Sequence, residues 1–197
     1  IQFAAHMGTG CIDQMQVAYP PTGGWAPHLS KQYVRINLNA GNNVILFAKD
    51  PSDPGFAELD CIELVPVYEA ENAQVNSAII YNNPAARNGK FVGGIDTPDI
   101  SSVVFGEIFV PTAGTYSFSV QYANGFAETS SHSIYVNNSY QMKITYVSTG
   151  GWAPKFSTAY VTLSLNAGIN SVKFQKNSDD IGFAELDCIT VASNSAN

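Results

Sequence analysis

Two carboxylates stand close together near the middle of the chain. Glu69 and Glu71 are separated by a single alanine. On an extended strand, residues i and i+2 project to the same face, so both side chains would point the same way. Neighbouring carboxylates repel each other unless a cation or a proton lies between them, and calcium takes about six to eight oxygen ligands. The spacing indicates either a calcium site or a solvated acidic strand face.

The only two tryptophans of the chain lie in identical turns. Trp25 and Trp152 each follow two glycines and precede Ala-Pro, which is typical of a loop rather than of a packed strand. Sugars present C–H faces that stack on aromatic rings, and hydroxyls that need well-placed carboxylate or amide partners. The pattern favours sugar-binding loops, the alternative being that each indole packs into a core.

Both tryptophans belong to an internal repeat. Residues 14–62 align without a gap on residues 141–189, and 28 of the 49 pairs are identical. Residues 67–119 have no counterpart in the first copy. We therefore expect residues 1–66 to be the C-terminal half of a first module, residues 67–192 to be a complete second module, and residues 193–197 to be a tail.

The first copy begins part of the way through the repeat. Ile1–Ala4 resembles Val120–Ala123, although reaching that match requires a deletion of eight residues in the first copy. A half module cannot close its core, because the missing strands would leave an apolar face and several strand edges in water. We expect the missing strands to come from a preceding stretch of the same polypeptide or from another chain.

The elements that position these residues are all predicted to be strands. Apolar and polar residues alternate with period two in short runs separated by Gly, Asn and Pro turns, and no stretch of a dozen residues keeps a helical period. Many short strands at this spacing predict an all-β sandwich or jelly roll. The runs with the clearest alternation are 116–122, 132–136, 141–144, 160–165 and 171–174.

Composition excludes several classes of protein. The 197 residues carry 16 acidic against 9 basic side chains, a formal charge of −7, and no cluster of Lys or Arg that could bind nucleic acid. No apolar run approaches the ~20 residues that span a membrane. The three cysteines include no CxxC pair, which argues against a zinc site or a disulfide scaffold. The sequon Asn137-Asn138-Ser139 favours a secreted, extracellular protein.

Six short motifs, in order along the second copy, resemble the carbohydrate-binding modules of families 35 and 6. The resemblance covers residues 67–192 fully and residues 1–66 as a half module, and it implies a noncatalytic β-jelly roll that contains calcium. The motifs are Tyr68–Ala73, Asn88–Asp96, Pro111–Tyr116, Val120–Gly125, Leu165–Asn170 and Glu185–Ile189.

The resemblance also implies which residues bind calcium and sugar. The calcium ligands would be Glu69, Glu71, the carbonyl of Lys90 and Asp187, with Asp60 as the equivalent of Asp187 in the half module. The sugar would contact a loop tryptophan, Trp152 or Trp25, and the residue before the Leu-Asp of the last strand, Glu185 or Glu58. The further candidates for the rim of the sugar site are Asp180, Asp53, Asn124 and Tyr81.

Two departures from the family pattern bear on the ligand. Glu185 and Glu58 replace a residue that is often Asn in the family, and no basic residue follows Asn124 up to Ser131. A second carboxylate disfavours an acidic sugar, so we expect a neutral sugar of the galactose or N-acetylgalactosamine type. Similar tandem modules occur in mushroom galactose-binding lectins.

Four functions therefore compete. We expect a calcium-containing lectin that recognises galactose-type glycans, and the main alternative is a substrate-targeting part of a larger secreted glycoside hydrolase. A purely structural adhesion role is the third, and the fourth is catalysis, for which Glu185 and Asp180 are the candidate carboxylates. The three histidines lie in no nucleophile motif, and we expect a protein that is not an enzyme.

Overall fold

The computed structural model describes residues 2–3, 15–30, 32, 34, 36, 38, 43–49, 51–62 and 65–193. The chain divides into two compact units, Ile1–Glu63 (unit 1) and Leu64–Asn197 (unit 2). The division lies between residues 63 and 64, whereas the sequence places it between 66 and 67. From residue 194 onward, the expected tail lies outside the described residues.

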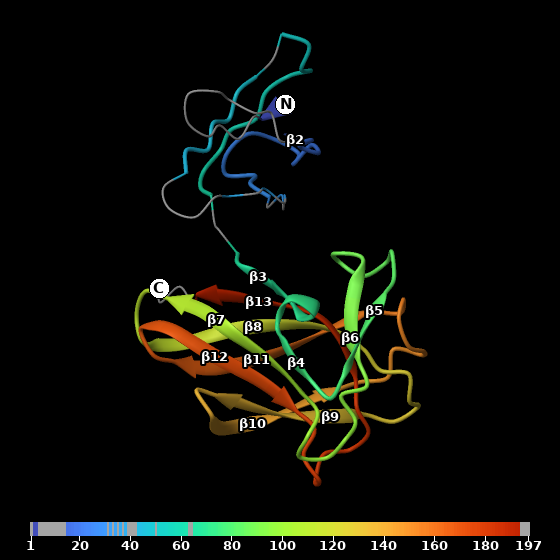
Figure 1. Ribbon diagram of the computed structural model, residues 1–197. Helices are drawn as coiled ribbons and strands as arrows, with labels where there is room; N and C mark the ends of the chain where they lie inside the picture. The colour runs from blue at the N-terminus through green and yellow to red at the C-terminus, as the bar shows by residue number, and fades with distance from the viewer. Residues whose placement is uncertain are drawn as a thin grey trace. The chain divides into compact units, whose positions relative to one another are not determined.

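Unit 2 is a sandwich of two sheets, which confirms the all-β expectation (Figure 1). One sheet has the order β10-β9-β12-β7-β4, the other has the order β11-β8-β13-β6-β5, and β3 pairs with β13; every pairing is antiparallel. The strands are β3 (Val67–Glu69), β4 (Gln74–Asn76), β5 (Ile79–Asn82), β6 (Lys90–Gly93), β7 (Ser102–Val110), β8 (Gly114–Ala123), β9 (Ser130–Val136), β10 (Ser139–Tyr146), β11 (Ser157–Leu165), β12 (Gly168–Gln175) and β13 (Glu185–Ser193).

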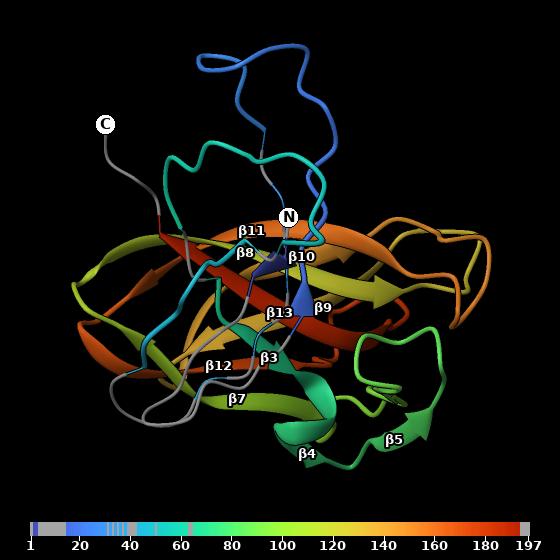
Figure 2. The ribbon, with the colours of Figure 1, turned by 90° about the horizontal axis from the view of Figure 1, so that it is seen from above.

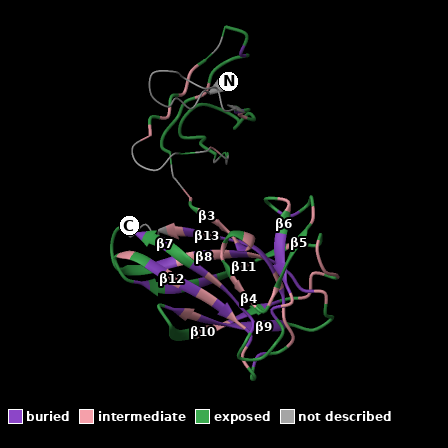
Figure 3. Ribbon diagram, viewed as in Figure 1, coloured by how far each residue is buried: buried purple, intermediate pink, exposed green. Residues whose placement is uncertain are grey.

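Alternation decides which face of each strand is buried. In β8, Tyr116, Phe118, Val120 and Tyr122 are buried, whereas the residues between them are only half-buried. Figure 3 shows the buried residues concentrated on the strands of unit 2 and the exposed ones on its loops. The five runs predicted from period-two alternation are confirmed, since they lie in β8, β9, β10, β11 and β12.

A single turn of 3-10 helix, η1 (Ala70–Asn72), follows β3 directly. The N–H of Ala73 donates to the carbonyl of Ala70 at 3.2 Å and closes the turn. Glu71 therefore lies in the turn, and the expectation that Glu69 and Glu71 share one extended strand is wrong. Seen from above, η1 lies close to β3 and β4 (Figure 2). The described residues include no helix of the length and apolarity that crossing a membrane would take.

Unit 1 contains little regular structure in its described residues. Two short strands, β1 (Gln2–Phe3) and β2 (Met15–Gln16), pair antiparallel. The other described residues of unit 1 form turns, bends and irregular structure. Much of the half module expected at residues 1–66 lies outside the described residues.

Candidate carbohydrate-binding site

An aromatic cluster lies where three loops of unit 2 meet. Trp152 comes from the β10–β11 loop, Phe183 from the β12–β13 loop and Phe126 from the β8–β9 loop. The Trp152 and Phe183 rings stack with centroids 5.0 Å apart, and Phe126 meets both edge-on at 5.1 Å. Trp152 is half-buried and Phe126 is exposed, so the cluster presents an apolar surface to solvent.

Two glycines let the backbone approach this cluster closely. A Cβ atom on Gly125 would lie 2.3 Å from Cε2 of Trp152, so a side chain there would displace the indole. A Cβ atom on Gly182 would lie 3.2 Å from the Phe126 ring, and Gly182 has a φ of +48°, which L-residues rarely adopt. The position of the Trp152 ring therefore depends on glycine at 125.

The side chain of Asn124 anchors the β8–β9 loop through hydrogen bonds. Its side chain is buried, and its Nδ2 donates to the carbonyls of Glu128 and Tyr146 at 2.9 Å each. Its Oδ1 accepts the N–H of Phe126 at 3.0 Å. Asn124 was predicted at the rim of the sugar site, but the structure gives its amide these contacts within the protein.

Glu185 begins β13 beside the tryptophan loop. Its Oε2 accepts the N–H of Ala153, the residue after Trp152, at 2.8 Å. The side chain is half-buried, and burial raises the pKa of Glu185 while the hydrogen bond from Ala153 opposes that shift. A carboxylate oriented in this way can accept hydrogen bonds from sugar hydroxyls next to an aromatic surface.

Tyr81 approaches Glu185 at Gly93. A Cβ atom on Gly93 would meet Cε2 of Tyr81 at 3.0 Å and Oε1 of Glu185 at 3.3 Å, so these two groups converge over the glycine. The exposed Tyr81 ring stacks on Phe91 with centroids 5.4 Å apart. Of the predicted rim residues, Tyr81 is the one that the structure brings to Glu185.

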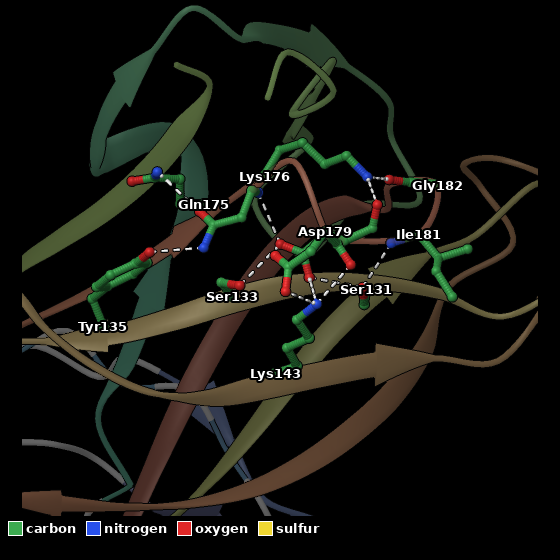
Figure 4. Close-up of polar contacts among 11 residues, drawn as sticks. Ser131, Ser133, Tyr135, Lys143, Gln175, Lys176, Asp179, Ile181 and Gly182 are labelled. Atoms are coloured by element: carbon green, nitrogen blue, oxygen red, sulfur yellow. Dashed lines mark hydrogen bonds and ion pairs between the residues drawn. The ribbon is translucent and has the colours of Figure 1, made fainter. Parts of the chain in front are cut away.

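Asp180 occupies a buried polar network instead of an open rim. Its carboxylate accepts the hydroxyls of Ser131 and Ser133 at 2.8 and 3.0 Å and the N–H of Asn177 at 2.8 Å. Lys176 donates from above to the carbonyls of Asp180 and Gly182 (Figure 4). Because its oxygens accept from β9 and from its own loop, Asp180 is also unsuited to serve as the partner of Glu185 in glycoside cleavage.

His132 is the one buried histidine among the described residues. Its Nε2 lies 3.1 Å from the carbonyl of Ile95 and its Nδ1 lies 3.3 Å from the hydroxyl of Tyr146. Burial lowers the pKa of His132 to about 4, so the ring is neutral at pH 7. Enclosed in the core, it has no access to a substrate.

Three carboxylates of the predicted calcium site converge on the segment at residues 87–88. Both oxygens of the buried Asp187 accept the N–H of Arg87, at 3.2 and 3.0 Å. Oε1 of Glu69 lies 3.6 Å from Nε of Arg87, and Oε1 of Glu71 accepts the side-chain amide of Asn88 at 3.0 Å.

Burial, with the charges of Asp187 and Glu69, raises the pKa of the Cys188 thiol to about 12.

The chemistry of this acidic group fits a hard cation. Oε2 of Glu71 is buried and accepts no hydrogen bond, and all the donor atoms are oxygens. Among the described residues, however, no group of three His, Cys, Asp or Glu side chains is positioned to hold a metal ion. Lys90, whose carbonyl was the fourth expected ligand, begins β6, and Asp60 of unit 1 is exposed.

Unit 1 repeats several of these contacts. Trp25 stacks on Phe56 with centroids 4.9 Å apart, and Oε2 of Glu58 accepts the N–H of Ala26 at 2.9 Å. These contacts match those of Trp152, Phe183, Glu185 and Ala153 position for position. The described part of unit 1 thus keeps the same local arrangement of tryptophan and glutamate.

The loop that carries Asp53 is also repeated in unit 1. The carbonyl of Asp53 accepts from Lys49 at 3.0 Å, as that of Asp180 accepts from Lys176. Oδ1 of Asp53 accepts from Gln16 at 3.1 Å, and its side chain is buried. Asp53 was predicted at a sugar rim, and the structure gives it contacts within unit 1, to Lys49 nearby in sequence and to Gln16 of β2.

The aromatic partners of Trp152 were not predicted from the sequence. Phe183 was within reach, because it lies in the repeated Gly-Phe-Ala-Glu-Leu-Asp motif and is kept as Phe56. Phe126 and the close approach of Gly125 had no such signal, since that part of the first copy carries different residues. Arg87 was missed because nothing local links it to the carboxylates that it contacts.

Comparison with known proteins identifies the family. Residues 69–193 match the family described as carbohydrate binding module (family 6). The structure is similar to a family 35 carbohydrate binding module from Clostridium thermocellum, with a TM-score of 0.62, 30% identity, and coverage of 65% of this chain and 98% of that chain.

Other relatives are larger enzymes. An exo-β-1,3-galactanase from Phanerochaete chrysosporium, solved with β-1,3-galactotriose, has a TM-score of 0.57 and 27% identity over 64% of this chain and 28% of its own. A 1,6-α-glucosyltransferase from Sporosarcina globispora is 28% identical over 176 residues, which are 85% of this chain and 14% of that protein. The relatives thus carry such modules within glycoside hydrolases and glucanotransferases, and they do not point specifically to a mushroom lectin. The chain belongs to the carbohydrate binding modules of family 6, which are noncatalytic and take carbohydrates as ligands.

Proposed function

We propose that unit 2 binds neutral, galactose-type sugars at the surface formed by Trp152, Glu185 and Tyr81. The hydrogen bond from Ala153 to Glu185 carries this proposal, because it fixes a carboxylate beside the tryptophan loop. The aromatic cluster offers a surface for a C–H face of the sugar, and Glu185 offers an acceptor for its hydroxyls. A half-buried carboxylate repels uronates, and the galactanase relative supports galactose.

The module serves a larger secreted enzyme by holding it on its substrate. The chain spans 14% of the glucosyltransferase and 28% of the galactanase, so most of each relative lies outside the matching region. A lectin is the second candidate, since unit 1 repeats the contacts of Trp25 and Glu58. Two such sites in a tandem repeat would gain avidity for clustered glycans.

Titration against monosaccharides tests the proposed ligand. We expect galactose and N-acetylgalactosamine to bind unit 2 at least about tenfold more tightly than glucuronic acid, which corresponds to about 1.4 kcal/mol. Calorimetric titration measures this ratio, and a glycan array extends it to linked sugars. A preference for the uronate, or hydrolysis of a polysaccharide by the purified protein, would contradict the proposal.

We further propose that calcium binds the carboxylates of Glu69, Glu71 and Asp187 together with the carbonyl of Lys90. The buried Glu71 Oε2, which accepts no hydrogen bond, supports this. Calcium would compete with the Arg87 and Asn88 donors for the same oxygens. Its role there is structural, because it would relieve the repulsion between the carboxylates.

Chelation tests the calcium proposal through stability. At a calcium concentration of 100 times Kd, binding adds about 2.7 kcal/mol, so the unfolding midpoint of unit 2 should rise by about 5–10 °C over the EDTA-treated protein. Differential scanning calorimetry measures the shift. Glu71→Gln should remove most of it, whereas Glu107→Gln, an exposed glutamate on β7, should keep it. Equal midpoints with calcium and with EDTA would overturn the proposal.

A further inference from the structure

The chain contains a single Asn-X-Ser/Thr sequon, Asn137-Asn138-Ser139. It lies in the turn between β9 and β10, and residues 137–141 are all exposed. Such a sequon is the acceptor for N-linked glycans when it is presented on a surface loop. The sugar-binding surface proposed above does not include this turn. Its exposure leaves room on the folded module for a bulky substituent.

The turn holds the sequon in a defined conformation. Val136 pairs with Ser139, so Asn137 and Asn138 form a two-residue hairpin loop. Their φ angles are +50° and +66°, as a type I′ turn requires, and asparagine is one of the residues that favour such angles. The fold therefore accommodates the sequon without strain, and it fixes the backbone at Asn137.

The turn lies at the end of unit 2 opposite the sugar-binding loops. β12 runs antiparallel to β9, with Val172 opposite Val136 at the end of β9, and β10 also runs back along β9. Loops β10–β11 and β12–β13 therefore share, with loop β8–β9, the end where β9 begins. The seven residues of β9 separate the two ends by about 20 Å. A glycan on the β9–β10 turn would leave the aromatic cluster accessible.

The side-chain amide of Asn137 bonds to the first residues of β12. Its Oδ1 accepts the N–H of Ser171 at 2.9 Å, and its Nδ2 donates to Oδ1 of Asn170 at 2.9 Å. The buried Asn170 in turn donates to the carbonyls of Asn166 and Gly168. An asparagine Nδ2 carries two hydrogens, and the contact with Asn170 takes one of them. A sugar can replace the other hydrogen while these bonds are kept.

We propose that Asn137 is an N-glycosylation site, and that the linked sugar replaces the Nδ2 hydrogen that Asn170 does not accept. The donor is an oligosaccharide carried on a lipid diphosphate. Nδ2 of Asn137 forms a bond to C1 of the first sugar, and the bond between that carbon and the diphosphate oxygen breaks. The lipid diphosphate leaves with the electron pair, and Nδ2 releases one proton. The proposal rests on secretion of the protein, as in the proposed function, and not on its sugar binding.

A purely structural role for Asn137 is the alternative. Its bonds to Ser171 and Asn170 would by themselves account for asparagine at this position. A glycosylation site also requires a hydroxyl residue at position 139, whereas the structural role does not. Substitutions of Ser139 therefore separate the two roles and leave the amide of Asn137 in place.

Expression of the 197-residue chain through the secretory pathway of yeast, behind a cleavable signal peptide, tests the proposal. Protein from the medium and from the secretory membranes is analysed by mass spectrometry. We expect most molecules to exceed 21.1 kDa by one N-linked glycan, and peptide-N-glycosidase to remove that glycan and convert Asn137 to aspartate. Ser139→Ala should abolish the glycan, whereas Ser139→Thr, which keeps the hydroxyl, should retain it.

A second measurement tests where the sugar lies on the amide. Glycosylated wild type and unglycosylated Ser139→Ala both keep the bonds to Ser171 and Asn170, so their unfolding midpoints should agree within about 2 °C. Asn137→Gly removes both bonds and tolerates the same positive φ, so its midpoint should be lower by about 3 °C or more. Differential scanning calorimetry gives the midpoints.

Wild type without a glycan, or a glycan that persists in Ser139→Ala, would overturn the proposal. A glycosylated wild type that unfolds at as low a temperature as Asn137→Gly would also overturn it, because the sugar would then have displaced the amide contacts. Binding of galactose by unit 2 does not enter any of these readouts, so the glycosylation site and the proposed sugar site can fail separately.

Discussion

Replacement of Trp152 with alanine is expected to weaken binding of galactose-type sugars by unit 2 about 30-fold or more. Truncation of a tryptophan at the centre of a binding surface typically costs about 2 kcal/mol or more of binding free energy. The loss follows because the aromatic surface shrinks and because Trp152 adjoins Ala153, which orients Glu185. Calorimetric titration of wild type and variant gives the ratio of dissociation constants.

Two variants separate a binding role of Trp152 from a structural one. Glu185→Gln keeps the shape of the side chain and an acceptor for Ala153, so it should weaken binding about tenfold at an unchanged unfolding midpoint. Tyr160→Ala removes an exposed aromatic ring from β11, away from the site, and should change neither property. If Trp152→Ala unfolded unit 2 while Glu185→Gln bound sugar normally, the indole would be a core residue and the proposed site would be wrong.

Trp25→Ala distinguishes the two candidate functions by the same measurement. Trp25 makes the stacking contact in unit 1 that Trp152 makes in unit 2. For a lectin with two working sites, each substitution should halve the number of sugars bound per chain. For a single working module on an enzyme, only Trp152→Ala should reduce sugar binding.

Strand positions in unit 2 could be predicted because alternation is a local property. The run Tyr116–Tyr122 shows by itself that one face of β8 is buried. It does not show that β8 lies between β11 and β13, because pairing depends on contacts far apart in the sequence. The resemblance to a known family implied a β-jelly roll but no strand order, which comes from the structure.

The candidate site was predicted less completely, and the reasons differ between residues. Glu185 and Tyr81 converge as the sugar-site hypothesis requires. Asp180 and Asn124 point into the protein. Asp180 accepts a hydrogen bond from Ser131 and Asn124 donates one to Tyr146, and nothing in the sequence places these partners beside each other. The spacing of Glu69 and Glu71 was interpreted for an extended strand, but Glu71 lies in a turn of 3-10 helix.

Asp180→Ala is expected to destabilise unit 2 by about 3 kcal/mol or more, because it removes the acceptor at the centre of a buried network. The hydroxyls of Ser131 and Ser133 and the N–H of Asn177 would lose the carboxylate to which they donate. The side chain of Asp180 is fully shielded from solvent, so water cannot replace it without the loop opening. Chemical denaturation followed by circular dichroism measures the change.

Asp179→Ala is the matched control. Asp179 is the neighbouring carboxylate and lies 2.7 Å from Nζ of Lys143, but its side chain is 71% exposed. Exposed ion pairs contribute about 0–1 kcal/mol, so this variant should unfold within about 1 kcal/mol of wild type. If the two substitutions lowered the free energy of unfolding equally, the hydrogen-bond network around Asp180 would stabilise unit 2 no more than an exposed charge does.

At acid pH, the difference in free energy of unfolding between wild type and Asp180→Ala should become smaller. Burial acts to raise the pKa of Asp180, but the hydrogen bonds from Asn177, Ser131 and Ser133 outweigh it and lower the pKa below the ordinary value of 3.8. A carboxyl whose pKa is lower in the folded state stabilises fully above its unfolded pKa and loses that contribution as pH falls through the folded pKa. The gap should therefore be constant from pH 7 to about pH 5 and shrink below about pH 4.

His132 gives the pH profile a second phase that both proteins share. Its pKa is lowered by burial to about 4 against 6.5 when exposed, so the unfolded chain takes up a proton between those values and folding stability falls as pH drops through them. Since His132 is neutral in both folded proteins above about pH 5, the decline between pH 6.5 and 5 is common to wild type and Asp180→Ala. The charge of Asp180 raises the pKa of His132, and its loss in Asp180→Ala acts only at lower pH, where it would widen the difference. A gap that already narrowed between pH 6.5 and 5 would show that the pKa of Asp180 is not lowered in the folded protein, and would contradict the assignment of its stabilising effect to hydrogen bonds.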